Sequence, residues 1–262
     1  GMGAAAITDH GNMFGAVEFY LKAKDAGIVP IIGSEVYVAI EGRTVKRAAR
    51  GNNDGANHLV ILATDDQGYR NLMKIVSIGF LEGFYYKPRV DKDVLREFSQ
   101  GLIAMSACIG GEVPQLIIQG HADEAERAAL EYAGIFGKDN FFLELQNHGI
   151  PEEDHVRPVL ADIGHRNGIG LVATNDAHYL RREHADSHDV LLCISTGKTL
   201  DDTNRMKMEQ PEFYLKTPNE MKELFKDYPE AIENTVRIAE RCKVVIQTGI
   251  YQTPIYKRPP DL

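Results

Sequence analysis

The sequence is poor in cysteine, in basic residues and in long apolar runs. It has no stretch of about eighteen apolar residues, so no helix is expected to span a membrane. The first ten residues lack a basic region followed by an apolar stretch, and we expect no secretory signal. The three cysteines, Cys108, Cys193 and Cys242, are too few and too scattered for a disulfide framework, which favours the reducing cytoplasm.

Positive charge is also in deficit. Lys and Arg total 29 against 38 Asp and Glu, which leaves a formal net charge of -9. Such a balance argues against a protein whose whole surface binds nucleic acid. It leaves open a small basic groove, or a domain within a larger DNA-handling protein.

What the chain does contain is a regular alternation of short apolar runs with longer amphipathic ones. This alternation predicts an α/β fold with parallel strands and helices packed outside them. The expected strands are 4–7, 29–32 continuing into 36–39, 58–63, 102–105, 141–145 and 171–173. The expected helices between them are 14–26, 66–81, 122–136 and 152–167.

After His178 the strand signals become rare, and helices are expected at 183–194, 219–225 and 229–242. We therefore place a soft boundary near residue 180, between an α/β domain over 1–180 and a helical extension over 181–262. The polar, Gly- and Asn-rich segment 41–57 is typical of a mobile loop or hairpin. Because the chain begins about three residues before its first expected strand, we expect further residues upstream.

Residues able to bind a metal follow nearly every expected strand. In parallel α/β folds the carboxyl ends of the strands open onto one face, where sites form. Imidazole and thiolate suit zinc, whereas carboxylates suit harder ions and can bridge two metals. Together they predict a polynuclear metal site for phosphoester hydrolysis. The residues are Asp9, His10, Glu35, Cys108, Glu144, His148, Asp176 and His178.

Structural alternatives exist for several of these residues. Asp9 could cap the helix that starts near Phe14, and Glu35 could be a solvated loop carboxylate. Cys108 could be a small buried apolar residue. His58 opens a strand instead of ending one, so its position alone favours a structural role. His184 and His188 have zinc-compatible i, i+4 spacing, but a surface or interface pair is the simpler interpretation.

Several segments resemble the polymerase and histidinol phosphatase (PHP) domains of bacterial DNA polymerase III alpha subunits. They include TDHGN at 8–12, GSEVYV at 33–38, GFYYKPRVD at 83–91 and TNDAHY at 174–179. The resemblance implies a distorted (β/α)7 barrel, here without its first strand and its H-x-H motif, followed by a helical extension toward a polymerase core. It also implies up to three divalent metal ions, with zinc favoured and manganese or iron as alternatives.

The resemblance assigns roles to individual residues. Glu35 looks like the carboxylate that bridges two metals, and Asp9, Glu144 and His148 would support the ligands from behind. Apart from the resemblance, Arg89 and Lys87 are candidates to neutralise the phosphate, because arginine holds phosphate oxygens in a fork, and a surface ion pair is the alternative for Arg89. The metal ligands implied by the resemblance are His10, Glu35, His58, Cys108, Asp176 and His178.

The resemblance implies a fragment of a replicative DNA polymerase, with its own 3′–5′ exonuclease-like phosphoesterase site. Its partners would be DNA, through the full-length polymerase, and other replicase subunits such as a proofreading exonuclease; no membrane partner is expected. Polymerisation should reside elsewhere, because no Asp-x-Asp pair on a strand follows residue 180. The alternatives are a non-catalytic scaffold for a proofreading subunit and a free-standing phosphatase of small molecules.

Overall fold

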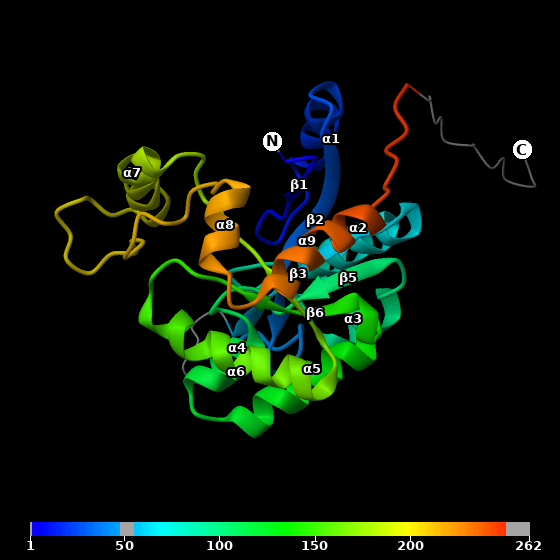
Figure 1. The fold of residues 1–262 in the computed structure, drawn as a ribbon. Coiled ribbons are helices and arrows are strands. Elements are labelled where there is room, and N and C mark those ends of the chain that lie inside the picture. The colour runs from blue at the N-terminus through cyan, green and yellow to red at the C-terminus, as the bar shows by residue number, and fades with distance from the viewer. Residues whose placement is uncertain (1, 48–54, 250–262) are drawn as a thin grey trace, which may run out of the picture.

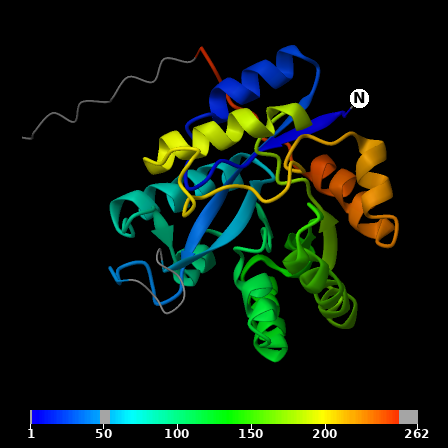
Figure 2. The same ribbon diagram turned by 90° about the vertical axis from the view of Figure 1, so that its left-hand side faces the viewer.

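The computed structural model describes residues 2–47 and 55–249, and it has a curled sheet with helices on both faces (Figures 1 and 2). Strand order is β1-β2-β3-β5-β6-β7, and β4 pairs with the second half of β2. The strands are β1 (Ala4–Ile7), β2 (Val29–Ala39), β3 (Ala56–Ala63), β4 (Arg89–Val90), β5 (Leu102–Met105), β6 (Phe141–Leu145) and β7 (Gly170–Ala173). This arrangement confirms the expected α/β class and a distorted, open barrel.

Helices connect most of these strands. Asp65 accepts a hydrogen bond from the Gly68 amide at the start of α2, and Asp91 caps α3 through the Val94 amide. The helices are α1 (Ala16–Asp25), α2 (Asp66–Leu81), α3 (Lys92–Phe98), α4 (Glu112–Ile118), α5 (Ala122–Phe136), α6 (Pro151–Asn167), α7 (Ala185–Thr196), α8 (Pro218–Leu224) and α9 (Pro229–Arg241). Two 3-10 turns, η1 (Lys138–Asn140) and η2 (Arg182–His184), precede β6 and α7. None of the helices in the described part of the chain is long and apolar enough to cross a membrane.

The expectation of uniformly parallel strands is wrong for β3. This strand runs antiparallel to both of its neighbours, β2 and β5. A parallel crossover needs a long connection, usually a helix, and the described residues of the polar connection between Ala39 and Ala56 form no helix. As a result, the start of β3 lies at the same end of the sheet as the ends of β1, β5, β6 and β7. Residues 48–54 of the predicted loop or hairpin lie outside the described residues.

Several elements differ from their predicted extents. The two expected runs 29–32 and 36–39 form one continuous strand, β2, because Gly33, Ser34 and Glu35 keep pairing with β3. The short elements β4, α3 and α4 were not predicted. They are two to seven residues long, too short for a hydrophobic period to distinguish them from loops.

Alternate residues of the strands pack on opposite faces of the sheet. One face meets α2 to α6 and holds the larger apolar core, with Ile61, Leu143 and Leu171 among its strand residues. The inner face carries a second apolar layer that includes Val60 and Phe142. Helix α9 contributes Ile238 to this inner layer.

The helical extension takes part in this packing. Ile238 and Cys242 lie in the inner apolar layer, and the Asn234 side-chain amide donates to the Leu171 carbonyl at 2.7 Å. In contrast, α7 buries only Cys193 and leaves Leu191 and Ile194 exposed. The division of the chain at residue 180 stays a prediction, and α9 connects the two parts.

Candidate metal centre

The site begins where the inner face of the sheet turns from apolar to polar. Glu35 lies in the middle of β2, opposite Val60 of β3. On the other side of β2, the backbone of Glu35 pairs with that of His10, in the segment after β1. His58, the third residue of β3, lies opposite Tyr37, so it points to the same face as Glu35. The antiparallel direction of β3 therefore explains how a residue at the start of a strand joins residues at strand ends.

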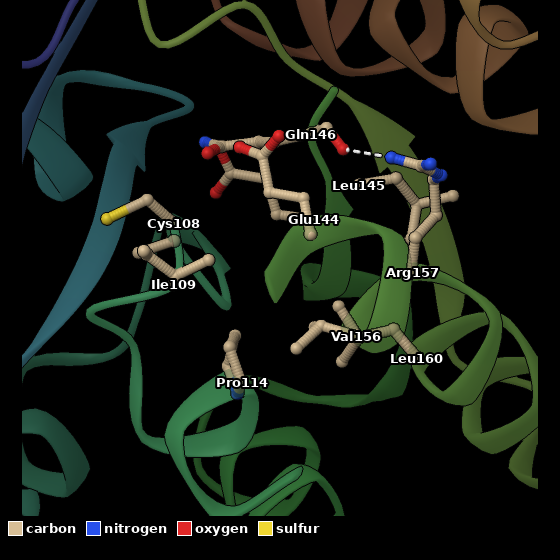
Figure 3. Close-up of a pocket in the computed structure, with 11 residues that line it drawn as sticks. Cys108, Ile109, Pro114, Glu144, Leu145, Gln146, Val156, Arg157 and Leu160 are labelled. Atoms are coloured by element: carbon tan, nitrogen blue, oxygen red, sulfur yellow. Dashed lines mark hydrogen bonds between the residues drawn. The ribbon is translucent and has the colours of Figure 1, made fainter. Parts of the chain in front are cut away.

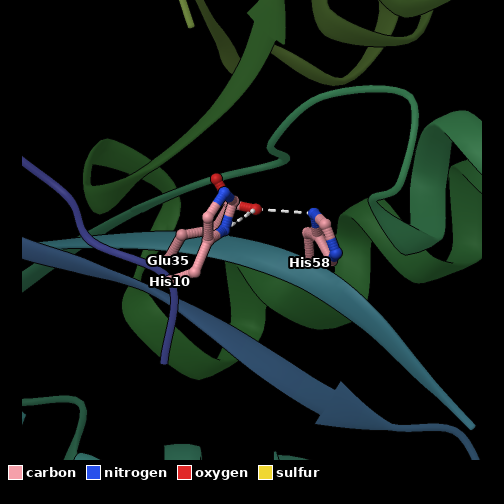
Figure 4. A group of neighbouring side chains, drawn as sticks. All are labelled: His10, Glu35 and His58. Carbon is pink, nitrogen blue, oxygen red and sulfur yellow. Dashed lines mark ion pairs between the residues drawn. The ribbon is translucent and has the colours of Figure 1, made fainter. Parts of the chain in front are cut away.

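Figure 4 shows the Glu35 carboxylate between two imidazoles. Its Oε1 atom lies 3.2 Å from His10 Nδ1 and 2.5 Å from His58 Nδ1. One ligand atom from each of the three residues lies within 4.8 Å of the other two. Glu35 is 5% exposed, so the alternative of a solvated loop carboxylate is wrong.

The charges of this trio reinforce one another. Burial raises the pKa of Glu35, but the contacts with His10 and His58 outweigh it and bring the pKa to about 2. Contact with Glu35 raises the pKa of His10 against the opposing effect of burial. An ionised carboxylate and a protonated imidazole attract each other, and the ionised carboxylate is also the form that binds a metal.

Cys108 approaches the trio from the loop after β5. Its Sγ atom lies 3.6 Å from His58 Nδ1 and accepts from the Gly110 amide at 3.4 Å. A Cβ atom on Gly110 would lie 3.1 Å from the same imidazole nitrogen, so glycine keeps this loop close to His58. Burial, and then the charges of Asp176 and Glu35, raise the pKa of the thiol well above its usual value. A cation would reverse this effect.

Asp176 and His178 come from the loop after β7. Asp176 has φ +41°, a left-handed conformation rare for residues other than glycine, and burial raises its pKa. The Nδ1 atom of His178 lies 2.8 Å from the Asp176 carbonyl, which can only accept, so Nδ1 carries the proton. The Nε2 atom of His178 is then the nitrogen left to bind a metal. The rings of His178 and His10 are 6.0 Å apart.

Glu144 lies deeper on the inner face, in β6. Its Oε1 atom accepts from Thr174 and from the Gln146 amide, and its backbone N–H donates to Ser106 Oγ. Burial is the main reason that its pKa rises to about 7. Beside it lies a pocket of about 10 Å³, enough for one water molecule, with Cys108 on its far wall (Figure 3).

His148 supports the site from behind. It is 1% exposed, and its Nδ1 atom lies 2.6 Å from Glu153 Oε1 while its Nε2 atom lies 2.9 Å from the Asn175 carbonyl. Both partners are acceptors, so both ring nitrogens donate and the imidazole is a cation paired with Glu153. Phe213 stacks on the ring at 4.1 Å and its carbonyl accepts from the His178 amide. This arrangement connects β6, the loop after β7 and the helical extension.

The sequence reasoning missed Glu153, Phe213 and Tyr37. Tyr37 stacks on His10 and meets His58 edge to face, with ring centroids 6.3 and 5.3 Å apart. Its position two residues after Glu35 on a strand was a usable signal. Glu153 lies in α6 and Phe213 follows α7, and neither carries a local signal of the site.

Two further predicted residues lie at the edge of the site. The Asp9 carbonyl accepts from the Glu35 amide at 3.0 Å. Helix α1 begins after Gly15, so the alternative in which Asp9 caps it is wrong. Lys87 lies 4.5 Å from the centre of the Tyr37 ring, close to His10.

Arg89 takes a different position from the one expected of a phosphate ligand. It is 1% exposed in β4, and its guanidinium donates to the carbonyls of Gly83 and Val45 at 3.2 and 2.8 Å. Arg89 therefore does not lie at the surface, as the alternative of a surface ion pair requires. A phosphate-binding role for Arg89 stays a prediction, and these contacts indicate that it also holds the backbone around it.

The residues present fit a divalent metal. Within residues 2–47 and 55–249, only two buried side-chain oxygens lack hydrogen-bond geometry with any partner, namely Glu35 Oε1 and Glu144 Oε2. His10, Glu35 and His58 form the one group of three potential ligands found among these residues. Burying several acidic groups together is costly unless a cation compensates them. The roles of the six predicted ligands stay predictions.

Comparison with known proteins places this architecture in a family. A model of the PHP domain matches residues 1–148, so the chain belongs to the PHP domain family. DNA polymerase III subunit alpha of Thermus aquaticus is 48% identical over 262 residues, 98% of this chain and 21% of that protein. Its counterpart in Borreliella burgdorferi is 50% identical over 97% of this chain and 22% of its own length. The chain thus spans about a fifth of the length of these relatives.

A solved structure was also compared. It is a protein of Bifidobacterium adolescentis assigned as a metal-dependent phosphoesterase, and it covers 67% of this chain and 77% of its own. The TM-score is 0.42 and the sequence identity is 16%.

Proposed function

We propose that this chain is the PHP domain of a replicative DNA polymerase alpha subunit and that its metal centre hydrolyses phosphoesters at DNA 3′ ends. The observation that carries the proposal is the convergence of His10, Glu35 and His58 on the inner face of the sheet, within 4.8 Å of one another. Cys108 contacts His58, and His178 lies beside His10. Residues from five strands, or from the loops after them, thus contribute to this region.

Each residue would have a defined task in holding the metals. Glu35, held between two imidazoles, would bridge two ions, and His178 would present Nε2 because its Nδ1 donates to the Asp176 carbonyl. The Lys87 ammonium, close to His10, would neutralise a phosphate. A bound divalent ion would supply Lewis-acid chemistry at the phosphoryl group.

The donor set also restricts the metal. Three imidazoles and a thiol favour zinc, and the carboxylates of Glu35 and Asp176 keep manganese and iron acceptable. His148 would hold the loop that carries Asp176, through its bond to Asn175. Glu144 and Asp9 would support the ligands from the inner side. Up to three ions are expected in a complete domain.

The relatives suggest the wider setting. Because they are DNA polymerase III alpha subunits, the natural partners would be DNA and other replicase subunits, such as a proofreading exonuclease, in the cytoplasm. The chain spans about a fifth of those proteins, so nucleotidyl transfer would reside in the remainder. A scaffold for a proofreading subunit, with metals serving only stability, is the main alternative.

The test is hydrolysis of single-stranded DNA from its 3′ end by the chain loaded with Zn²⁺ or Mn²⁺. His10→Ala and Glu35→Ala should abolish nucleotide release, whereas replacing the exposed His121, which pairs with Glu124 before α5, by Ala should keep it. Release that persists in both site variants would contradict the proposal and favour the scaffold. Hydrolysis of histidinol phosphate without release from DNA would instead favour a small-molecule phosphatase.

A further inference from the structure

Four imidazoles form a row across the mouth of the inner face. The ring centroids of His58 and His10 are 5.8 Å apart, those of His10 and His178 are 6.0 Å apart, and those of His178 and His188 are 5.7 Å apart. The first three are predicted ligands. The fourth, His188, belongs to α7 in the helical extension, where the sequence favours a surface or interface histidine.

The contact with His178 is how α7 meets the metal centre. Helix α7 lies to the left of the strands in Figure 1 and toward the viewer in Figure 2. His188 is partly buried there, beside Tyr179 at 5.4 Å between ring centroids. Only Cys193 of α7 is fully buried, so apolar packing gives this helix little support.

The spacing of the two rings suits a shared cation. A zinc–imidazole bond of about 2.0–2.1 Å places the ring centroids of two ligands on one tetrahedral ion about 5 Å apart. The observed 5.7 Å, with the rings at 69°, is close to that separation. His178 has its Nδ1 proton committed to the Asp176 carbonyl, which leaves Nε2 for the ion.

We infer that His188 is a further metal ligand, which holds a divalent cation together with His178 at the outer end of the proposed centre. The inference rests on the proposed function and adds to it, since it brings a residue of the helical extension into the site. Metal binding would then fasten α7 to the barrel. Water or a phosphate oxygen of the substrate would complete the coordination.

The experiment measures binding of Zn²⁺ alone to the purified chain by titration calorimetry, with Co²⁺ absorption spectra as a second readout. His188→Ala should bind one zinc ion fewer than the parent chain, or its zinc affinity should fall. The fall should exceed the roughly 10–100-fold loss that follows removal of a residue which only supports a ligand. His184→Ala, one helical turn earlier, is the matched control and should bind like the parent chain. His188→Asp, which restores a donor, should recover part of the affinity.

The outcomes separate this inference from the proposed function. Unchanged stoichiometry and affinity in His188→Ala, with weakened binding in His10→Ala, would overturn the role of His188 and leave the metal centre standing. No zinc binding by the parent chain would overturn both. Circular dichroism confirms that each variant is folded, and His188→Gln replaces the alanine variant if that one unfolds.

Discussion

At the scale of single residues, the site places several acidic groups close together away from solvent. Glu35 and Glu144 are each 5% exposed, and the charge of Asp176 acts on both Glu144 and the Cys108 thiol. Without a cation, only part of this set can be ionised at neutral pH. The protonation of Glu144 should therefore be visible in the stability of the metal-free chain.

Glu144→Gln should flatten the dependence of stability on pH in the presence of a chelator. The folded pKa of Glu144 is about 7, above its usual value of 4.5, so the folded state holds the proton more tightly. The free energy of unfolding should then fall as pH rises from 4.5 to about 7, by up to about 3 kcal/mol, and Gln removes this loss. Urea unfolding from pH 4.5 to 8 measures it. Glu124→Gln, at an exposed position, should keep the parental slope.

His148→Ala should destabilise the fold and weaken metal binding together. It removes the imidazole that pairs with the buried Glu153 and leaves only the backbone N–H of residue 148 on that carboxylate, which costs about 3–5 kcal/mol, and it releases the Asn175 carbonyl next to Asp176. Zinc affinity should fall by roughly 10–100-fold. The control is His165→Ala, whose exposed pair with Glu230 should contribute less than about 1 kcal/mol. Equal stability losses in the two variants, by urea unfolding, would contradict the supporting role.

The residues of the site differ in how predictable they are. His10, His58 and His178 each stand at the end or the start of an apolar run, so local sequence is sufficient to propose them. Glu153 and Phe213 reach His148 from a helix and from a distant loop, and the pattern around them is that of any amphipathic segment. Their role depends on tertiary packing, which the sequence alone does not display.

At the scale of elements, the sequence shows where strands and helices lie but not how strands pair. The alternation identifies the longer helices to within a few residues, since an apolar period over ten or more residues is distinctive. The direction of β3 depends on pairing with β2 and β5, which are separated from it along the chain. The apolar pattern of one face of a strand is the same in either direction, so the residues of β3 itself do not show its direction. The polar connection before it, predicted as a loop or hairpin, was the usable signal.

Contacts between elements lead to a prediction about two glycines. A Cβ atom on Gly68 in α2 would lie 1.8 Å from the Gly101 carbonyl oxygen, whereas one on Gly134 in α5 would meet nothing within 4 Å. Gly68→Ala should destabilise the chain by at least about 1–3 kcal/mol because α2 must move away from the turn before β5. Gly134→Ala should stabilise it by about 0.5–1 kcal/mol. Thermal unfolding of both variants tests the pair, and equal shifts would contradict the close packing.

At the scale of the whole molecule, metal binding should contribute to stability, because the ligands come from both ends of the strand order. His10 follows β1 and His178 follows β7, at the two ends of the strand order. An ion held between them restricts how far the open sheet can spread. Stability should therefore depend on metal even if no hydrolysis occurs.

Removal of metal should lower the melting temperature of the parent chain. At a free zinc concentration about 100 times the dissociation constant, binding adds about 2.7 kcal/mol to the free energy of unfolding. Calorimetry with Zn²⁺ and with a chelator measures the difference. Glu35→Ala should abolish most of it, whereas Glu18→Ala on the exposed face of α1 should not. If the parent chain melts at the same temperature with Zn²⁺ and with the chelator, it does not hold a stabilising ion.

The ladder between β2 and β3 has a consequence for how such chains can diverge. Backbone pairing of His58 with Tyr37 fixes the position of this imidazole in the site. The length of the connection between the two strands does not affect that position. Insertions and deletions in that connection can accumulate without moving the ligand. A slip of the ladder by a single residue, in contrast, would turn His58 toward the opposite face and remove it from the centre in one step.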